Sequence, residues 1–293
     1  MQLALMAYGS WGLLALYWKQ LAHVWAVEQL VHRVVWAAVC LVGLLAVRGR
    51  LGEIAALLRV RETRRRLCVS AALIAINWFV FVYAVATDRV LHVSLGYYIN
   101  PIVSVCLGMI FLGERLRRLQ WAALVAALAG IASLLWWAGE LPWIGVSVAL
   151  AFGFYGLARK TLAVDPLPAT AIETLLLSPV CLAGILWLEL GAQTGQLWRG
   201  GLWTTGLLLA AGPATALPIL WFGGAARRLP LSAIGFLQYI TPTAHFLFAV
   251  LLFGERFSTG HAVAFICIWL GVGLFLLDRM LVAREARLEA SRR

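Results

Sequence analysis

Hydrophobic residues lie along this chain in long blocks that are separated by short polar segments. The blocks are about 18–25 residues long, and an α-helix of that length crosses a bilayer core of about 30 Å. The pattern therefore predicts an all-α membrane protein with about ten transmembrane helices. The expected spans are residues 3–21, 27–47, 67–86, 93–112, 119–138, 142–160, 169–189, 203–226, 231–253 and 261–278.

The composition agrees with a chain that is surrounded by lipid. Hydrophobic residues make up 63% of the sequence and charged residues 13%, whereas a soluble domain is about 45–50% apolar and about 25% charged. The formal charge of +11 does not indicate a nucleic-acid partner, because the basic residues lie between the apolar blocks, where they set membrane topology. The five cysteines are odd in number and include no Cys-x-x-Cys pair, so neither disulfides nor a metal site is predicted. No cofactor is expected.

The distribution of Lys and Arg predicts the orientation, because cytoplasmic loops carry an excess of these residues. With the N-terminus inside, nineteen of them fall in inner segments and four in outer segments. The loop 48–66 is the densest inner segment. We therefore expect both termini in the cytoplasm, with residues 279–293 as a charged tail and the first apolar block retained as a span.

The sequence repeats itself after 141 residues, and the two halves align without a gap. The expected repeats are residues 1–141 and 142–278, with five spans each. Because five is an odd number, the second copy enters the membrane from the opposite side, which is the plan of many secondary transporters. Equivalent positions include Gly12 and Gly153, Asn100-Pro101 and Thr241-Pro242, Gly130 and Gly271, and the runs Phe111–Arg115 and Leu252–Arg256.

The stretches Tyr97-Tyr-Ile-Asn-Pro101 and Leu112-Gly-Glu-Arg-Leu116 resemble the drug/metabolite transporter superfamily in its EamA-domain branch. The stretch Pro230–Pro242, and Tyr17-Trp-Lys19 followed by His32-Arg33, are more specifically similar to the RarD group of that branch. The resemblance covers essentially the whole chain. It implies a ten-span transporter of small metabolites or drug-like molecules in the bacterial inner membrane, and it implies no particular substrate.

Pro101 and Pro242 fall near the middle of their spans. A proline inside a helix removes a backbone hydrogen bond and clashes with the carbonyl of residue i−4, and a freed carbonyl in lipid must find a partner or line a wet cavity. We expect paired kinks beside a substrate site, the alternative being kinks that serve packing. The residues expected to bind substrate are Tyr98, Asn100, Gln238, Tyr239 and Thr241 near the kinks, with Arg33, Asn77 and Trp78 from other spans.

Ionisable groups inside spans are candidates for function, because a charge in a membrane is costly. Arg33 either contacts substrate or snorkels to the interface near Glu28. Glu173 is equivalent to His32 in the repeat, and these two residues are the candidates for proton coupling. The alternative for Glu173 is an interfacial carboxylate at a helix start, and for His32 it is the same interfacial placement as for Arg33.

The two Gly-Glu-Arg turns, at Glu114 and Glu255, are interpreted as structural. The glycine ends one helix, and the glutamate is expected to start the next near its positive end. Lys19 and Lys160 end their spans and are expected to snorkel to the interface.

Transport by alternating access is the function that the pattern favours, with export driven by the proton gradient. A membrane-embedded enzyme is the main alternative, but the three aspartates are far apart and no metal-ligand spacing occurs. A non-transporting membrane sensor is the other alternative. No P-loop is present, so direct use of ATP is not predicted. The expected partners are a small-molecule substrate and the lipid bilayer.

Overall fold

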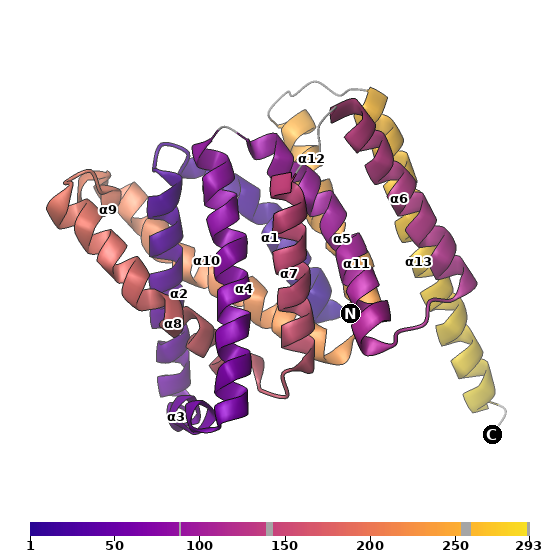
Figure 1. Ribbon diagram of the computed structural model, residues 1–293, viewed down its shortest axis with the longest axis horizontal. Helices are drawn as coiled ribbons and strands as arrows, with labels where there is room; N and C mark the ends of the chain where they lie inside the picture. Colours follow the sequence, from indigo (N-terminus) through magenta and orange to yellow (C-terminus); the bar gives the residue numbers. More distant parts are fainter. Residues whose placement is uncertain (88, 139–142, 253–258, 292–293) are drawn as a thin grey trace.

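The computed structural model describes residues 1–87, 89–138, 143–252 and 259–291, and within these ranges the chain is helical and forms no strand (Figure 1). The elements are α1 (Gln2–Gln20), α2 (Ala26–Val47), α3 (Gly52–Arg59), α4 (Arg61–Ala86), α5 (Val90–Leu112), α6 (Arg118–Ala138), α7 (Trp143–Thr161), α8 (Pro166–Leu186), the π-helix η1 (Trp187–Gly191), α9 (Gln196–Arg199), α10 (Gly201–Arg228), α11 (Leu231–Gln238), α12 (Ile240–Leu251) and α13 (Thr259–Ser291).

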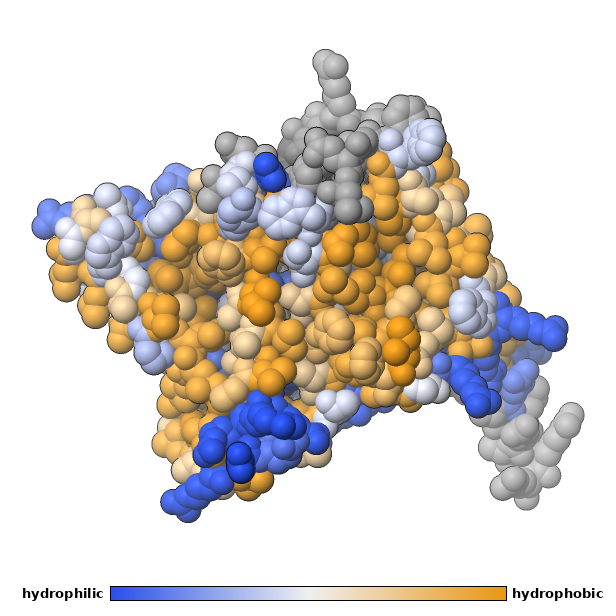
Figure 2. Space-filling model, in the orientation of Figure 1, coloured by the Kyte–Doolittle hydropathy of each residue, from blue (hydrophilic) through white to orange (hydrophobic). Residues whose placement is uncertain are grey.

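The chain has the helices and the surface of a membrane protein. On the face shown in Figure 2, a broad apolar area lies between hydrophilic groups at two edges. Many large apolar side chains of the chain are exposed. Lipid is the solvent that such a surface requires. In the described residues, five helical segments are long and apolar enough to cross a bilayer: Ala26–Val47, Arg61–Ala84, Pro166–Gly191, Gly201–Arg228 and Ala262–Val282; Gly96–Leu112 and Arg118–Ser133 are shorter apolar segments.

The helices pack into one bundle with a peripheral pair. α2 packs against α8 and α10, α5 packs against α7 and α11, and α1 contacts α10 and α12. α6 and α13 lie side by side at one side of the molecule (Figure 1). The largest buried cluster joins α1, α7, α10 and α11, where the ring of Phe222 stacks on Tyr155 at 5.8 Å between ring centroids.

Glycines allow α6 and α13 to approach closely. A Cβ atom placed on Gly130 would lie 2.9 Å from the carbonyl oxygen of Ala264, and one placed on Gly271 would lie 2.7 Å from that of Ala123. Small residues permit such close backbone contact between membrane helices. Ala123 and Ala264 are themselves separated by 141 residues, as Gly130 and Gly271 are. The glycine of each half therefore contacts the equivalent alanine of the other half.

A second pair of glycines repeats this relation in the main bundle. A Cβ atom on Gly12 would lie 2.7 Å from the Cβ of Ala244, and one on Gly153 would lie 2.6 Å from Cγ1 of Val103. Val103 and Ala244 are again equivalent positions. The contact of α1 with α12 therefore has its counterpart in the contact of α7 with α5.

The two prolines have different surroundings. α5 runs through Pro101 without interruption, whereas the expected span 231–253 is divided into α11 and α12 at Tyr239, shortly before Pro242. Pro242 has no N–H to offer Gln238, and its ring crowds the carbonyl of that residue. The interruption is a single residue, because Tyr239 keeps φ −61° and ψ −15°. The same loss of an N–H at Pro101 leaves α5 continuous. α13 continues beyond the expected span to Ser291, so the described part of the charged tail is helical.

Candidate binding cavity

A cavity of about 410 Å³ lies among α1, α2, α4, α5, α7, α10, α11 and α12. Pockets for small-molecule ligands are typically about 300–1,000 Å³, so its size suits a small metabolite. The walls are mostly apolar and aromatic, with Trp11, Trp18, Trp78, Phe81 and Phe152 among them. The polar lining residues are Tyr8, Gln29, Arg33, Asn77, Tyr97, Asn100, Gln238, Thr241 and His245.

The lining contains residues that are equivalent in the two halves of the chain. The ring centroids of one such pair, Trp11 and Phe152, lie 5.7 Å apart in an edge-to-face arrangement. The cavity is therefore bounded by matching positions of both halves. The equivalent lining pairs are Trp11 and Phe152, Trp78 and Ile219, Tyr97 and Gln238, and Asn100 and Thr241.

Arg33 places a cation in the wall of the cavity. Its guanidinium carbon lies 4.6 Å from the ring centroid of Trp78 and 5.5 Å from that of Trp18, distances at which an aromatic face attracts a cation. Among the described residues no carboxylate lies within ion-pair distance of Arg33. The nearby Glu28 instead accepts a hydrogen bond from the Gln196 N–H at 2.5 Å.

Several buried polar atoms of the cavity residues have no hydrogen-bond partner among the described residues. They are the Tyr8 hydroxyl, Arg33 Nε, Asn100 Oδ1 and Gln238 Oε1. An unsatisfied buried polar group costs about 1–3 kcal/mol, and native proteins leave few of them. Such atoms beside a cavity require partners that the protein itself does not provide.

Other polar residues of the lining are held by the backbone. Thr241 donates its hydroxyl to the Tyr8 carbonyl at 2.9 Å, Asn77 donates its amide to the Val148 carbonyl at 3.0 Å, and His245 lies 3.2 Å from the carbonyl of Trp11. These bonds fix the side chains of α4 and α12 against α7 and α1.

Three residues that the sequence assigns to the site do not line this cavity. Tyr98 approaches the carbonyl of Pro242 at 3.5 Å and packs beside Tyr239 in a separate hydrophobic cluster with Phe236. Pro101 is also absent from the lining, whereas Pro242 belongs to it. Successive helical residues point about 100° apart, so Tyr97 rather than Tyr98 faces the cavity.

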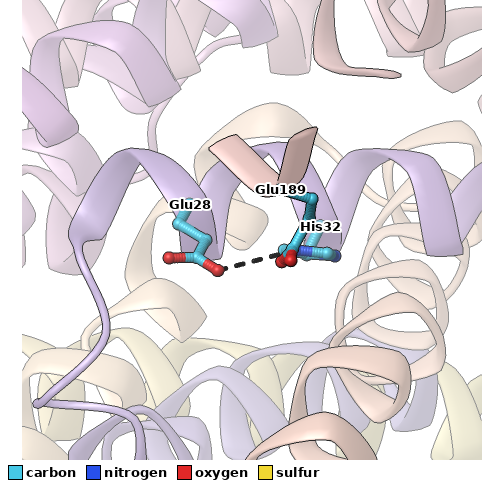
Figure 3. Close-up of side chains that lie close together, drawn as sticks. All are labelled: Glu28, His32 and Glu189. Atoms are coloured by element: carbon cyan, nitrogen blue, oxygen red, sulfur yellow. Dashed lines mark ion pairs between the residues drawn. The ribbon is translucent and has the colours of Figure 1, made fainter. Parts of the chain in front are cut away.

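His32 belongs to a different cluster, with Glu28 beside it on α2 and Glu189 on η1 (Figure 3). One ligand atom of each residue lies within 4.8 Å of the others, and all three residues are buried. The Trp36 indole donates to His32 Nδ1 at 3.1 Å, so Nε2 carries the hydrogen of a neutral ring. Nε2 lies 3.9 Å from Glu28 Oε1.

Glu173 is part of a buried ion pair. Its Oε1 lies 3.0 Å from Arg159 Nη1 and accepts a hydrogen bond from Ser70 at 2.5 Å, while its Oε2 accepts one from the Tyr155 hydroxyl at 3.2 Å. Arg159 also donates to Thr170 at 3.2 Å. Arg159 lies near the end of the expected span 142–160, and its side chain is buried against α8.

Glu114 caps a helix of the other half of the chain. Its carboxylate accepts from the Leu231 N–H at 2.6 Å, and from the N–H and hydroxyl of Ser232 at 2.9 and 2.7 Å. The expected structural role is present, but the helix that it starts is α11 and not the following helix α6. The equivalent Glu255 and Arg256 lie outside the described residues.

Lys160 contacts the C-terminal end of α10. Its Nζ donates to the Leu229 carbonyl at 2.5 Å and approaches that of Ala226 at 3.5 Å. A cation is favourable at this end of a helix. The contact also joins α7 to the segment between α10 and α11.

Fold and cavity together define a helical membrane protein with a cavity lined by residues from both halves of the chain. The EamA-like transporter family matches residues 1–136 and again residues 142–277. The chain therefore belongs to the EamA-like transporter family, and it is a membrane transporter of the drug/metabolite class.

Relatives that share most of their length with this chain agree with that assignment. Protein RarD of Salmonella typhi is 42% identical over 283 residues, covering 97% of this chain and 96% of that protein. An uncharacterized transporter of Pseudomonas aeruginosa is 43% identical over 282 residues, covering 94% and 92%. The chloramphenicol-sensitive protein RarD of the same species is 34% identical over 222 residues, covering 75% and 73%. The predicted resemblance to RarD proteins is confirmed.

A solved structure has the same fold. A crystal structure of a protein with 18% sequence identity superimposes with a TM-score of 0.71 and covers 95% of this chain and 98% of its own. At this identity the likeness concerns the fold alone.

Proposed function

We propose that this protein is a secondary active transporter that moves small metabolites across the bacterial inner membrane by alternating access. It crosses the membrane ten times as two inverted five-helix repeats, with both termini in the cytoplasm. The observation that carries the proposal is the cavity, which is enclosed by equivalent residues of the two halves and contains unpartnered polar atoms.

The exchange of helix contacts between the halves supports the inverted repeat. The equivalent helices α6 and α13 pack on each other. The contact of α5 with α7 has its counterpart in the contact of α12 with α1. In the same way, the contact of α4 with α7 has its counterpart in the contact of α10 with α1. Two copies related in this way can rock against each other about a site between them. Such rocking exposes the cavity to one side of the membrane and then to the other.

A proton gradient is the proposed energy source, with export as the net direction. The cluster of Glu28, His32 and Glu189 can hold a proton inside the protein, because His32 Nε2 and two carboxylates converge there. The charged group that faces it from α9 is Arg199, which lies 3.4 Å from Glu189 Oε2. Glu173, the equivalent of His32, is neutralised by Arg159 and is the weaker candidate.

Transport in reconstituted liposomes tests this proposal. Uptake of radiolabelled metabolites, with aromatic acids and amphenicol drugs in the panel, is measured with and without a pH gradient. The proposal expects accumulation that depends on the gradient, and substrate exchange that does not. Glu28→Gln should abolish gradient-driven accumulation but retain exchange, because Gln keeps an acceptor for the Gln196 N–H. Failure of every compound to exchange across the liposome membrane would refute a transporter with this cavity as its site.

A further inference from the structure

We propose that the cavity selects an organic anion, namely a carboxylate that has an apolar or aromatic body and a hydrogen-bond donor. The inference rests on the proposed function, since it names the substrate class of the same site. Three features of the lining support it: the positive charge of Arg33, an aromatic wall, and two amide oxygens that accept no hydrogen bond from the described residues.

The charge of the cavity is positive. Arg33 is a cation of the lining, and the described lining residues include neither Asp nor Glu. The guanidinium is held between ring faces at 4.6 and 5.5 Å, and its Nε has no acceptor. A guanidinium offers donors in a fixed fork that matches a carboxylate. An anionic ligand therefore supplies the acceptor that Arg33 lacks, whereas a cationic ligand is repelled by it.

The wall of the cavity suits an apolar body. Trp11 and Phe152 contact each other edge to face, and the ring of Trp11 also lies 5.8 Å from that of Phe222. Aromatic faces and edges of this kind pack well against a flat ring or a branched aliphatic chain. A volume of about 410 Å³ leaves room for one such group beside Arg33.

The unpartnered amide oxygens require a donor on the ligand. Asn100 Oδ1 and Gln238 Oε1 accept no hydrogen bond from the part of the chain that the structure describes, and the two residues are only 2% and 6% exposed. A hydroxyl or amino group on the ligand supplies the missing donor. Hydroxy acids and amino acids both carry this combination, but the described part of the lining offers no carboxylate to pair with an ammonium. A hydroxy acid matches the charges of the lining more closely.

Equilibrium binding to the purified protein in detergent separates these requirements, with intrinsic Trp fluorescence as the readout. The probes are 3-phenyllactate, its neutral amide 3-phenyllactamide, 3-phenylpropionate without the hydroxyl, phenylalanine, and the cation phenethylamine. We expect 3-phenyllactate to bind about ten- to hundred-fold more tightly than its amide, the range that one hydrogen-bonded charge contributes. We expect 3-phenylpropionate and phenylalanine to bind more weakly than 3-phenyllactate, and phenethylamine to bind weakest.

Variants assign the effect to residues. Arg33→Gln should remove the preference for 3-phenyllactate over its amide, Arg33→Lys should retain part of it, and Arg48→Gln at the C-terminal end of α2 should leave it unchanged. Gln238→Leu should reduce the preference for 3-phenyllactate over 3-phenylpropionate. If Arg33→Gln does not fold, as judged by its thermal unfolding, the probe series on the parent and on Arg33→Lys decides the question.

Two results would overturn the inference: equal affinity of the parent for 3-phenyllactate and its amide, or an unchanged preference in folded Arg33→Gln. Because the readout is binding, its outcome is distinct from that of the transport assay. Anion-selective binding without transport would retain the inference and refute the proposed function. Transport of neutral or cationic compounds alone would retain the proposed function and refute the inference.

Discussion

The ion pair between Arg159 and Glu173 predicts that Glu173→Gln destabilises the protein. Nη1 and Oε1 lie 3.0 Å apart, and the two side chains are 2% and 3% exposed. At that distance two unit charges attract each other by about 5.5 kcal/mol at an effective dielectric constant of about 20. The amide abolishes this attraction and leaves the guanidinium buried without its counter-charge. Breaking a buried pair by removing one partner costs about 3–5 kcal/mol, and we expect a loss in that range.

A double-mutant cycle isolates the pair from other effects. Arg159→Met combined with Glu173→Gln removes both charges, so the double variant should lose about 1–3 kcal/mol less than the sum of the single variants. The matched control is Glu53→Gln. Glu53 accepts a hydrogen bond from Arg50 at 2.6 Å. The two side chains of this pair at the start of α3 are 32% and 40% exposed, so its loss should cost much less than that of the buried pair.

Unfolding of the purified variants in mixed micelles, titrated with SDS and followed by Trp fluorescence, measures these differences. Gradient-driven uptake into liposomes is measured in parallel. Additive single variants, or a Glu173→Gln variant as stable as the parent, would refute the ion-pair reasoning. A stable Glu173→Gln variant that exchanges substrate but ignores the pH gradient would instead make Glu173 the proton carrier.

Three further predictions concern packing, capping and topology. Gly271→Ala places a Cβ 2.7 Å from a backbone oxygen, whereas Gly273 has nothing within 4 Å. Gly271→Ala should therefore cost about 1–3 kcal/mol in the same SDS titration, and Gly273→Ala should be neutral. Glu114→Ala removes the cap of α11 and should cost about 1–2 kcal/mol, measured in the same way; an unchanged midpoint would contradict the capping role. A reporter at the C-terminus should lie in the cytoplasm and a tag within 190–202 outside, as read by protease accessibility; both on one side would exclude the inverted repeat.

The fold could be predicted from the sequence largely because lipid imposes a simple rule on it. Each backbone group must be paired within the membrane, so long apolar blocks become helices. The lining of the candidate cavity overlaps in part with the residues that the sequence singles out. Asn100, Gln238 and Thr241 line the cavity, as do Arg33, Asn77 and Trp78. These residues were recognisable as polar or aromatic groups in apolar surroundings.

The differences between the expected residues and the cavity lining have identifiable causes. Helical periodicity places Tyr97 and Asn100, three residues apart, on one face, so Tyr98 lies outside the lining. Arg159 lies near the end of an expected span, and hydropathy marks where a span ends but not the direction of a side chain. Glu189 lies beside His32 because η1 packs on α2. The two residues are far apart in the sequence, so no local sequence pattern predicts this contact.

The helices that carry the two prolines differ in form at equivalent positions, and this difference has a consequence for alternating access. Tyr98 and Tyr239 are equivalent, yet α5 is continuous through Tyr98 whereas the other half divides into α11 and α12 at Tyr239. If the repeats exchange conformations during transport, α5 breaks near Tyr98 in the opposite state while α11 and α12 join. Pro242→Ala restores a backbone donor and should favour the joined form. Backbone hydrogen exchange should then be slower around Tyr239 and faster around Tyr98 than in the parent. Slower exchange at Tyr239 without any change at Tyr98 would show that the two helices do not alternate.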